Sequence, residues 1–204
     1  MKTRIITLIT LLTIVLSISV SSAATLKNDK DVQTPVVLAT NNVNKIEVSG
    51  NVEVYVTSGD KDQVKVYNKY YAQNAFVQDK DGILRIASYS ADKLVVLVTV
   101  TDLRAITASD NAAIKSFGKL LLIDFNLVLN NRASAQLNID AVAAKVTLNN
   151  RATADISGSV IEYESAFSQS STLNKTKLTA VNIIEKNTTK AAVATQTEEK
   201  VASL

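Results

Sequence analysis

The sequence predicts an all-β chain that folds as a single-stranded parallel β-helix, or β-solenoid, with coils of about 19–21 residues and a strand-rich N-terminal cap. The first observation is a repeat: Leu129–Ala135 reads Leu-Asn-Asn-Arg-Ala-Ser-Ala, and Leu148–Ala154 reads Leu-Asn-Asn-Arg-Ala-Thr-Ala, 19 residues later. The second is that the period continues, because Ile106–Ile114 aligns 21 residues upstream and Ser165–Leu173 aligns 19 residues downstream. A period near 20 residues is typical of a solenoid, in which stacked coils share one core.

Two columns of mostly apolar residues run through the repeats. They lie two residues apart, which is the spacing of side chains on one face of a strand. The columns are Ile106, Leu127, Val146 and Ser165, and Ala108, Leu129, Leu148 and Phe167. Helical solenoids have repeats of roughly 33 residues or more, and these segments are rich in Val, Ile and Thr. The sequence therefore favours strands over helical repeats.

A polar corner follows the apolar columns in each repeat. Asp110, Asn131 and Asn150 share one corner position, and both residue types tolerate a left-handed backbone, which matters in a chain with only five glycines. Because stacked strands lie about 4.8 Å apart, Asn131 and Asn150 are expected to form a ladder of amide hydrogen bonds. Arg132 and Arg151 would repel each other at that distance, so we expect both side chains in solvent.

Outside the repeats, residues 1–23 predict a secretory signal peptide, because two basic residues precede an apolar stretch that ends in Ser-Ser-Ala-Ala. The stretch is shorter than the roughly 20 residues that span a bilayer, which favours export over a membrane anchor. We expect residues 24–35 to form a linker, residues 36–185 to form the β-solenoid domain, and residues 186–204 to form a flexible tail. The expected product has no transmembrane segment and is exported to the periplasm, the outer surface or the medium.

Charge and cysteine content exclude several classes of protein. The chain has 22 basic and 19 acidic residues, and removing the signal peptide would take away Lys2 and Arg4 and leave the charge almost balanced. Nucleic-acid binding needs a basic surface, so no nucleic-acid partner is expected. The absence of cysteine excludes a disulfide framework and a lipidated N-terminal cysteine.

The N-terminal half is predicted to be strand-rich but less regular. Val43–Thr57 matches the later repeat at three periods, because Ile46 precedes Ile106 by 60 residues. Further strands are expected at Val64–Tyr67, Phe76–Val77, Ile83–Ile86 and Leu94–Val100, with a hairpin turn at Asp81-Gly82. We expect this half to cap the solenoid, because an open end presents an edge that aggregates.

Three features resemble the putative auto-transporter adhesin head domain, or GIN domain, of secreted Bacteroidetes proteins. They are Val48–Val54, the hairpin at Asp79–Ile86, and the repeated polar corners, and the resemblance covers about Val37 to Ile184. Family corners usually read Ser-Gly-Ser/Ala-Gly, so the Asn-Asn-Arg-Ala corners identify a divergent member. The resemblance implies an exported β-solenoid with an adhesin role, and it supplies no catalytic residues.

The residue types argue against catalysis. The chain has no His and no Cys, which removes the usual general base, the thiol nucleophile and most transition-metal sites. A carbohydrate-active β-helix enzyme would need converging carboxylates, and the repeat places its four Asp residues in different columns: Asp110, Asp124, Asp140 and Asp155. We therefore expect a protein that is not an enzyme and that holds no cofactor or metal. The alternative is a carbohydrate-active β-helix enzyme that acts on polysaccharide.

Two surfaces are candidate binding sites for a cell-surface glycan or an envelope protein. The first is a set of aromatic side chains for glycan contact, Tyr67, Tyr70 and Tyr71. The alternative is that these side chains only cover the core of the capping sheet. The second is the polar ladder with its arginines. The alternative is that this corner is solvated and has only a structural role. The predicted function is an exported binding or structural module for adhesion or the cell envelope.

Overall fold

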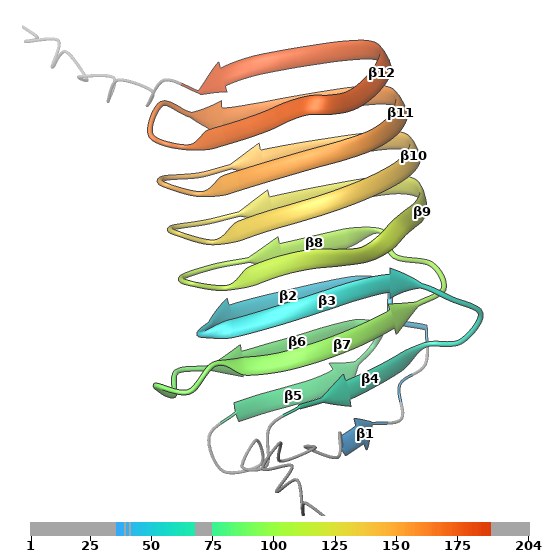
Figure 1. Cartoon of the computed structure of the whole chain (residues 1–204), viewed down its shortest axis with the longest axis vertical. Coiled ribbons are helices and arrows are strands. Elements are labelled where there is room, and N and C mark those ends of the chain that lie inside the picture. The colour runs from blue at the N-terminus through green and yellow to red at the C-terminus, as the bar shows by residue number, and fades with distance from the viewer. Residues whose placement is uncertain (1–35, 39, 41, 68–74, 189–204) are drawn as a thin grey trace, which may run out of the picture. The chain divides into compact units, whose positions relative to one another are not determined.

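Every regular element in the described part of the chain is a β-strand (Figure 1). The computed structural model describes residues 36–38, 40, 42–67 and 75–188. Its strands are β1 (Val36–Leu38), β2 (Lys45–Gly50), β3 (Val52–Ser58), β4 (Gln63–Val66), β5 (Ala75–Lys80), β6 (Ile83–Ser88), β7 (Leu94–Val100), β8 (Ala105–Ala108), β9 (Ala113–Leu129), β10 (Ser134–Leu148), β11 (Thr153–Ser168) and β12 (Thr172–Thr188). The prediction of an all-β chain is confirmed. Within these ranges no helix is long and apolar enough to cross a membrane.

Several predicted boundaries fall outside the described residues. The predicted signal peptide (1–23) and linker (24–35) lie there entirely, as does most of the predicted tail (186–204). Strand β12 runs through Thr188, so regular structure continues three residues past the predicted domain end.

The twelve strands form one curled sheet of mixed orientation. Eight pairs are parallel: β2–β6, β2–β8, β3–β7, β3–β9, β8–β9, β9–β10, β10–β11 and β11–β12. The pairs β1–β4, β4–β7 and β5–β6 are antiparallel. A purely parallel β-helix therefore does not describe the whole sheet. The hairpin at Asp81-Gly82 shows one reason: a two-residue turn joins antiparallel strands, and both residues have positive φ, 53° and 75°.

The later strands repeat in the predicted register. Leu127, Val146 and Ser165 are partners in successive strands, as are Leu129, Leu148 and Phe167. The spacing between β9 and β10 changes along the pair: Lys115 is partnered 21 residues on, and Lys119 only 19 residues on. Extra residues in β9 therefore account for the longer first period in the sequence.

The order of the coils in space differs from their order in the chain. The sequence placed Ile46 three periods before Ile106, but the two are direct partners because β2 pairs with β8 and β3 pairs with β9. Strands β6 and β7 lie on the other side of β2 and β3 (Figure 1). The chain thus builds one coil, adds strands on one side of it, and then returns to build the repeats on the other side.

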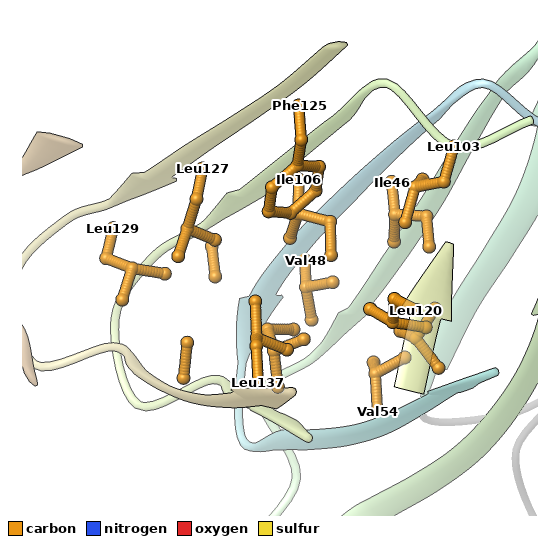
Figure 2. Close-up of a cluster of buried hydrophobic side chains, with 14 of the residues drawn as sticks. Ile46, Val48, Val54, Leu103, Ile106, Leu120, Phe125, Leu127, Leu129 and Leu137 are labelled. Carbon is orange, nitrogen blue, oxygen red and sulfur yellow. The ribbon is translucent and has the colours of Figure 1, made fainter. Parts of the chain in front are cut away.

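Inward-facing apolar side chains fill the space between the two faces of the coils. Strands β2 and β7 alternate strictly between buried and half-buried residues, and β3 does so up to Thr57. Figure 2 shows Ile46, Ile106 and Leu127 from one face meeting Val54 and Leu137 from the other, and each of the five is at most 1% exposed. Truncating such a residue to Ala typically costs about 2–5 kcal/mol.

The last coil replaces core residues with an ion pair. Strand β12 pairs only with β11, so its outer edge has no strand partner within the described residues. Glu185 takes the column of Ser165 and Val146, and it forms an ion pair with Lys175 of the same strand. Charged side chains at such positions discourage edge-to-edge pairing with another chain.

Candidate functional site

The polar corners are tight turns with a left-handed residue in each. Asp110, Asn131 and Asn150 have φ of 62°, 63° and 61°, as Asn and Asp allow. A backbone hydrogen bond closes each turn, for example from the Ala133 N–H to the Asn130 carbonyl at 3.1 Å. Because the turns are identical and the strands are in register, the corners stack.

A ladder of side-chain hydrogen bonds connects the stacked corners. The Asn150 amide donates from Nδ2 to Asn131 Oδ1 at 3.1 Å, and Asn131 donates from Nδ2 to Asp110 Oδ1 at 3.0 Å. The preceding residues form a second, half-buried rung, in which Asn149 Nδ2 donates to Asn130 Oδ1 at 2.8 Å. A carboxylate oxygen accepts hydrogen bonds, so Asp110 forms the accepting end of the row that runs from Asn150 through Asn131.

Tyr89 ends the ladder on the side of the earlier strands, and sequence reasoning missed it. Its hydroxyl donates to Asp110 Oδ2 at 3.2 Å, although the side chain is 75% exposed. The ring lies beside Gly50, where an added Cβ would meet Tyr89 Cδ1 at 3.2 Å. The only signal in the sequence was a lone aromatic residue between two serines.

Arg132 and Arg151 occupy the next position of the corner on neighbouring coils. Both are exposed, and the Arg132 Nε–H donates to Asn111 Oδ1 at 2.9 Å. Neither guanidinium forms an ion pair with a carboxylate of the described residues. Together with Asp110, Asn131, Asn150 and Ser170 they line a hollow of about 580 Å³. We call these six residues, with Tyr89, the corner site.

A second polar cluster lies on β3 and serves the fold. Glu53 accepts hydrogen bonds from Lys115 Nζ and the Tyr55 hydroxyl, each at 2.7 Å, and from Lys93 Nζ at 3.1 Å. The bonds from Lys115 and Tyr55, with that from Lys93, lower the pKa of the Glu53 carboxyl to about 2. Lys115 also lies over the Tyr55 ring, 5.5 Å from its centre. The cluster joins β3 to β9 through charge.

Another hollow, about 740 Å³, lies on β9–β12 and is lined in part by acidic side chains. Asp124 and Glu162 both line it and share one column, with Ala143 between them. This pair was not predicted from the sequence, because the predicted columns included only the Asp residues of the repeats. Nearby, hydrogen bonds from Lys186 and Lys145 lower the pKa of the Glu164 carboxyl.

The predicted aromatic surface is only partly described. Tyr67 follows β4, is half-buried, and donates its backbone N–H to the Val95 carbonyl at 2.9 Å. Tyr70 and Tyr71 lie outside the described residues, so their glycan contact stays a prediction. Across the ranges that the structure describes, no group of three or more His, Cys, Asp or Glu side chains could hold a metal ion.

Comparison with known proteins gives a family and a fold. Residues 42–203 match the family described as "Putative auto-transporter adhesin, head GIN domain". Among solved structures, a putative adhesin from Parabacteroides distasonis is 17% identical, with a TM-score of 0.55 over 76% of this chain and 77% of its own. A putative lipid binding protein from the same organism is 9% identical, with a TM-score of 0.58 over 76% and 78%. No curated protein sequence matches the chain.

Proposed function

Because the chain belongs to the putative auto-transporter adhesin, head GIN domain family, we propose that it is an exported, non-enzymatic module for adhesion at the cell envelope. The family description supports this, as does the structural similarity to a protein named a putative adhesin. The similarity to a protein named a putative lipid binding protein is one of fold, at an identity too low to transfer a ligand.

We also propose the finer description of the domain, residues 36–185, as a β-solenoid that operates beyond the inner membrane. Four parallel pairs, β8 to β12, lie in successive order with one corner per coil. Such stacking makes a stiff surface, because each backbone hydrogen bond to a neighbouring coil holds the next corner in place. A stiff surface loses little conformational entropy when it binds.

The corner site is the observation that carries the proposal. It presents amides, two guanidiniums, a carboxylate and a tyrosine ring on one exposed edge of the stacked coils. Amide and guanidinium donors suit the hydroxyl and acidic oxygens of sugars, and an exposed aromatic ring suits the apolar face of a sugar. A cell-surface glycan is therefore the partner that we propose, and an envelope protein is the other partner class.

A carbohydrate-active enzyme is the second candidate, and one observation favours it. Asp124 and Glu162 face the same hollow two coils apart, and inverting glycosidases use carboxyl groups separated by about 6.5–9.5 Å. A catalytic acid there would make Glu162→Gln abolish turnover while leaving the fold intact.

A glycan array and turnover assays with the same polysaccharides separate the two functions. We expect retained binding without new reducing ends, and weaker retention when Arg132 and Arg151 are both changed to Ala. Release of oligosaccharides without retained binding would reverse the ranking. Glu162→Gln serves as the matched control, because it alters the other hollow and should leave glycan binding by the corner site unchanged.

A further inference from the structure

Two of the four arginines in the described ranges are without a carboxylate partner, and both lie in the corner site. Arg85 forms an ion pair with Glu47 at 3.0 Å, and Arg104 forms one with Asp102 at 2.7 Å. Arg132 and Arg151 are on neighbouring coils and form no such pair within the same ranges. Most exposed lysines of the coils are also paired, for example Lys93, Lys145 and Lys186.

Holding two uncompensated guanidiniums on neighbouring coils is unfavourable without a counter-charge. The coils are about 4.8 Å apart, and like charges on adjacent strands destabilise the pair. The acid among the residues that line the hollow is Asp110, and both of its carboxylate oxygens already accept hydrogen bonds, from Tyr89 at 3.2 Å and from Asn131 at 3.0 Å. An anionic ligand would remove the repulsion and would gain two charge-assisted contacts.

The arrangement of donors favours a chain-like ligand over a single ion. Arg132 and Arg151 follow Asn131 and Asn150 at equivalent positions of neighbouring coils, so two guanidinium-bearing residues accompany the ladder along the stacking direction. Each amide uses one N–H in the ladder and has a second N–H donor. A linear polymer could thus place acidic groups on the arginines and hydroxyl groups on the amides of successive coils.

We propose that the corner site binds an acidic polysaccharide, with its carboxylate or sulfate groups on Arg132 and Arg151; this rests on the proposed glycan-binding function. The two guanidiniums form bidentate contacts with the acidic groups. Asn131 and Asn150 donate to oxygens of the sugar between them. The exposed Tyr89 ring receives a neutral sugar beyond the charged part. Nucleic acid is the less suitable polyanion, because the near-neutral charge of the chain provides no extended basic surface.

The test is biolayer interferometry with the purified protein against polygalacturonate, heparin and dextran. We expect the protein to bind polygalacturonate or heparin, to bind dextran at least tenfold more weakly, and to lose affinity as salt is raised. The polymer that binds more tightly identifies the acidic group as carboxylate or sulfate. The variant R132A/R151A should lose at least tenfold in affinity for that polymer. R132K/R151K, which keeps the charge but not the planar fork, should fall between the two.

A charge-matched control excludes general electrostatic attraction. R104A/K177A removes one exposed arginine and one exposed lysine from elsewhere on the coils, and its affinity should stay within twofold of the original protein. An equal loss in this control overturns the corner site as the location. If dextran binds as tightly as the acidic polymers and R132A/R151A abolishes that binding, the ligand need not be acidic. This result overturns the inference of an acidic polysaccharide but leaves the proposed glycan-binding function standing. No binding to any of the three polymers overturns this inference, and the glycan array then decides on the broader function.

Discussion

Gly50 and Gly118 offer a matched test of how closely neighbouring coils pack at the corner. Both have φ of +83°, so Ala is strained to the same extent at each. An added Cβ at Gly118 meets nothing within 4 Å, whereas one at Gly50 lies 2.1 Å from the backbone carbonyl oxygen of Ser88. The two substitutions therefore share a left-handed φ and differ in the space available to the new Cβ.

The expected costs follow from that difference. A left-handed L-residue costs roughly 1–2 kcal/mol, partly offset by the lower entropy of the unfolded chain, so Gly118→Ala should destabilise by about 1 kcal/mol. Gly50→Ala carries the same strain and must also displace the backbone at Ser88, which holds Asn51 by a 2.6 Å hydrogen bond. A backbone clash belongs to the mechanisms that produce large losses, so we expect about 3–5 kcal/mol.

Urea unfolding followed by circular dichroism measures both costs, since the chain contains no Trp for fluorescence. In a domain of this size 1 kcal/mol corresponds to roughly 2–4 °C in Tm, which gives thermal melts a second reading. If Gly50→Ala fails to fold while Gly118→Ala folds normally, the free-energy cost at Gly50 exceeds the stability of the domain, which also agrees with the prediction. Equal losses in the two variants would refute the reasoning, because the close approach would then contribute nothing.

Three further predictions concern the ladder, the charged cluster and the last coil. Asn150→Ala should lower the free energy of unfolding by about 1–2 kcal/mol, because it forces Ala into a left-handed turn and removes an exposed rung. Arg151→Ala should leave the Tm in thermal melts unchanged or slightly raised. The reverse order would mean that the arginine is the structural residue. The pKa of Glu53 falls from 4.5 to about 2 on folding, so its contribution is complete above about pH 4.5 and is lost as the pH falls toward 2. Urea unfolding across that range should show a steeper decline in stability for the original protein than for Glu53→Gln, which keeps the other carboxyls with lowered pKa, Glu47 and Glu164; parallel curves would contradict this. Lys175→Ile combined with Glu185→Val should produce concentration-dependent oligomers on size-exclusion chromatography, because the exposed edge of β12 loses its inward charges; a monomer at all concentrations would show that the ion pair does not protect the edge.

The repeats could be predicted because their information is local. A column of apolar residues at a constant spacing specifies both the inward face and the register, as the pairing of Leu129 with Leu148 shows. The left-handed Asn131 and Asn150 could be predicted for the same reason, since few residue types tolerate that backbone. The hydrogen bond between Asn131 and Asn150 is exposed, which reduces its expected contribution to stability. The bond between Asn130 and Asn149 is better buried.

The order of the coils could not be predicted, because periodicity says which residues face inward but not which coils touch. Ile46 precedes Ile106 by three periods in the sequence, yet the two are partners on neighbouring strands. The ion pair that joins β3 to β9 was hidden for the same reason. Glu53 and Lys115 are 62 residues apart in the sequence and bond at 2.7 Å.

The composition of the corner site depends on that unexpected order. Tyr89 follows β6, which lies on one side of β2, while Asp110 follows β8, which lies on the other side. The tyrosine must therefore reach across the coil that ends in Gly50 to donate its 3.2 Å hydrogen bond to Asp110. A side chain at Gly50 would occupy the space beside the ring. Gly50 is thus required twice, by the close backbone of Ser88 and by the ring of Tyr89, and Gly50→Ala should disturb the aromatic end of the corner site as well as the fold.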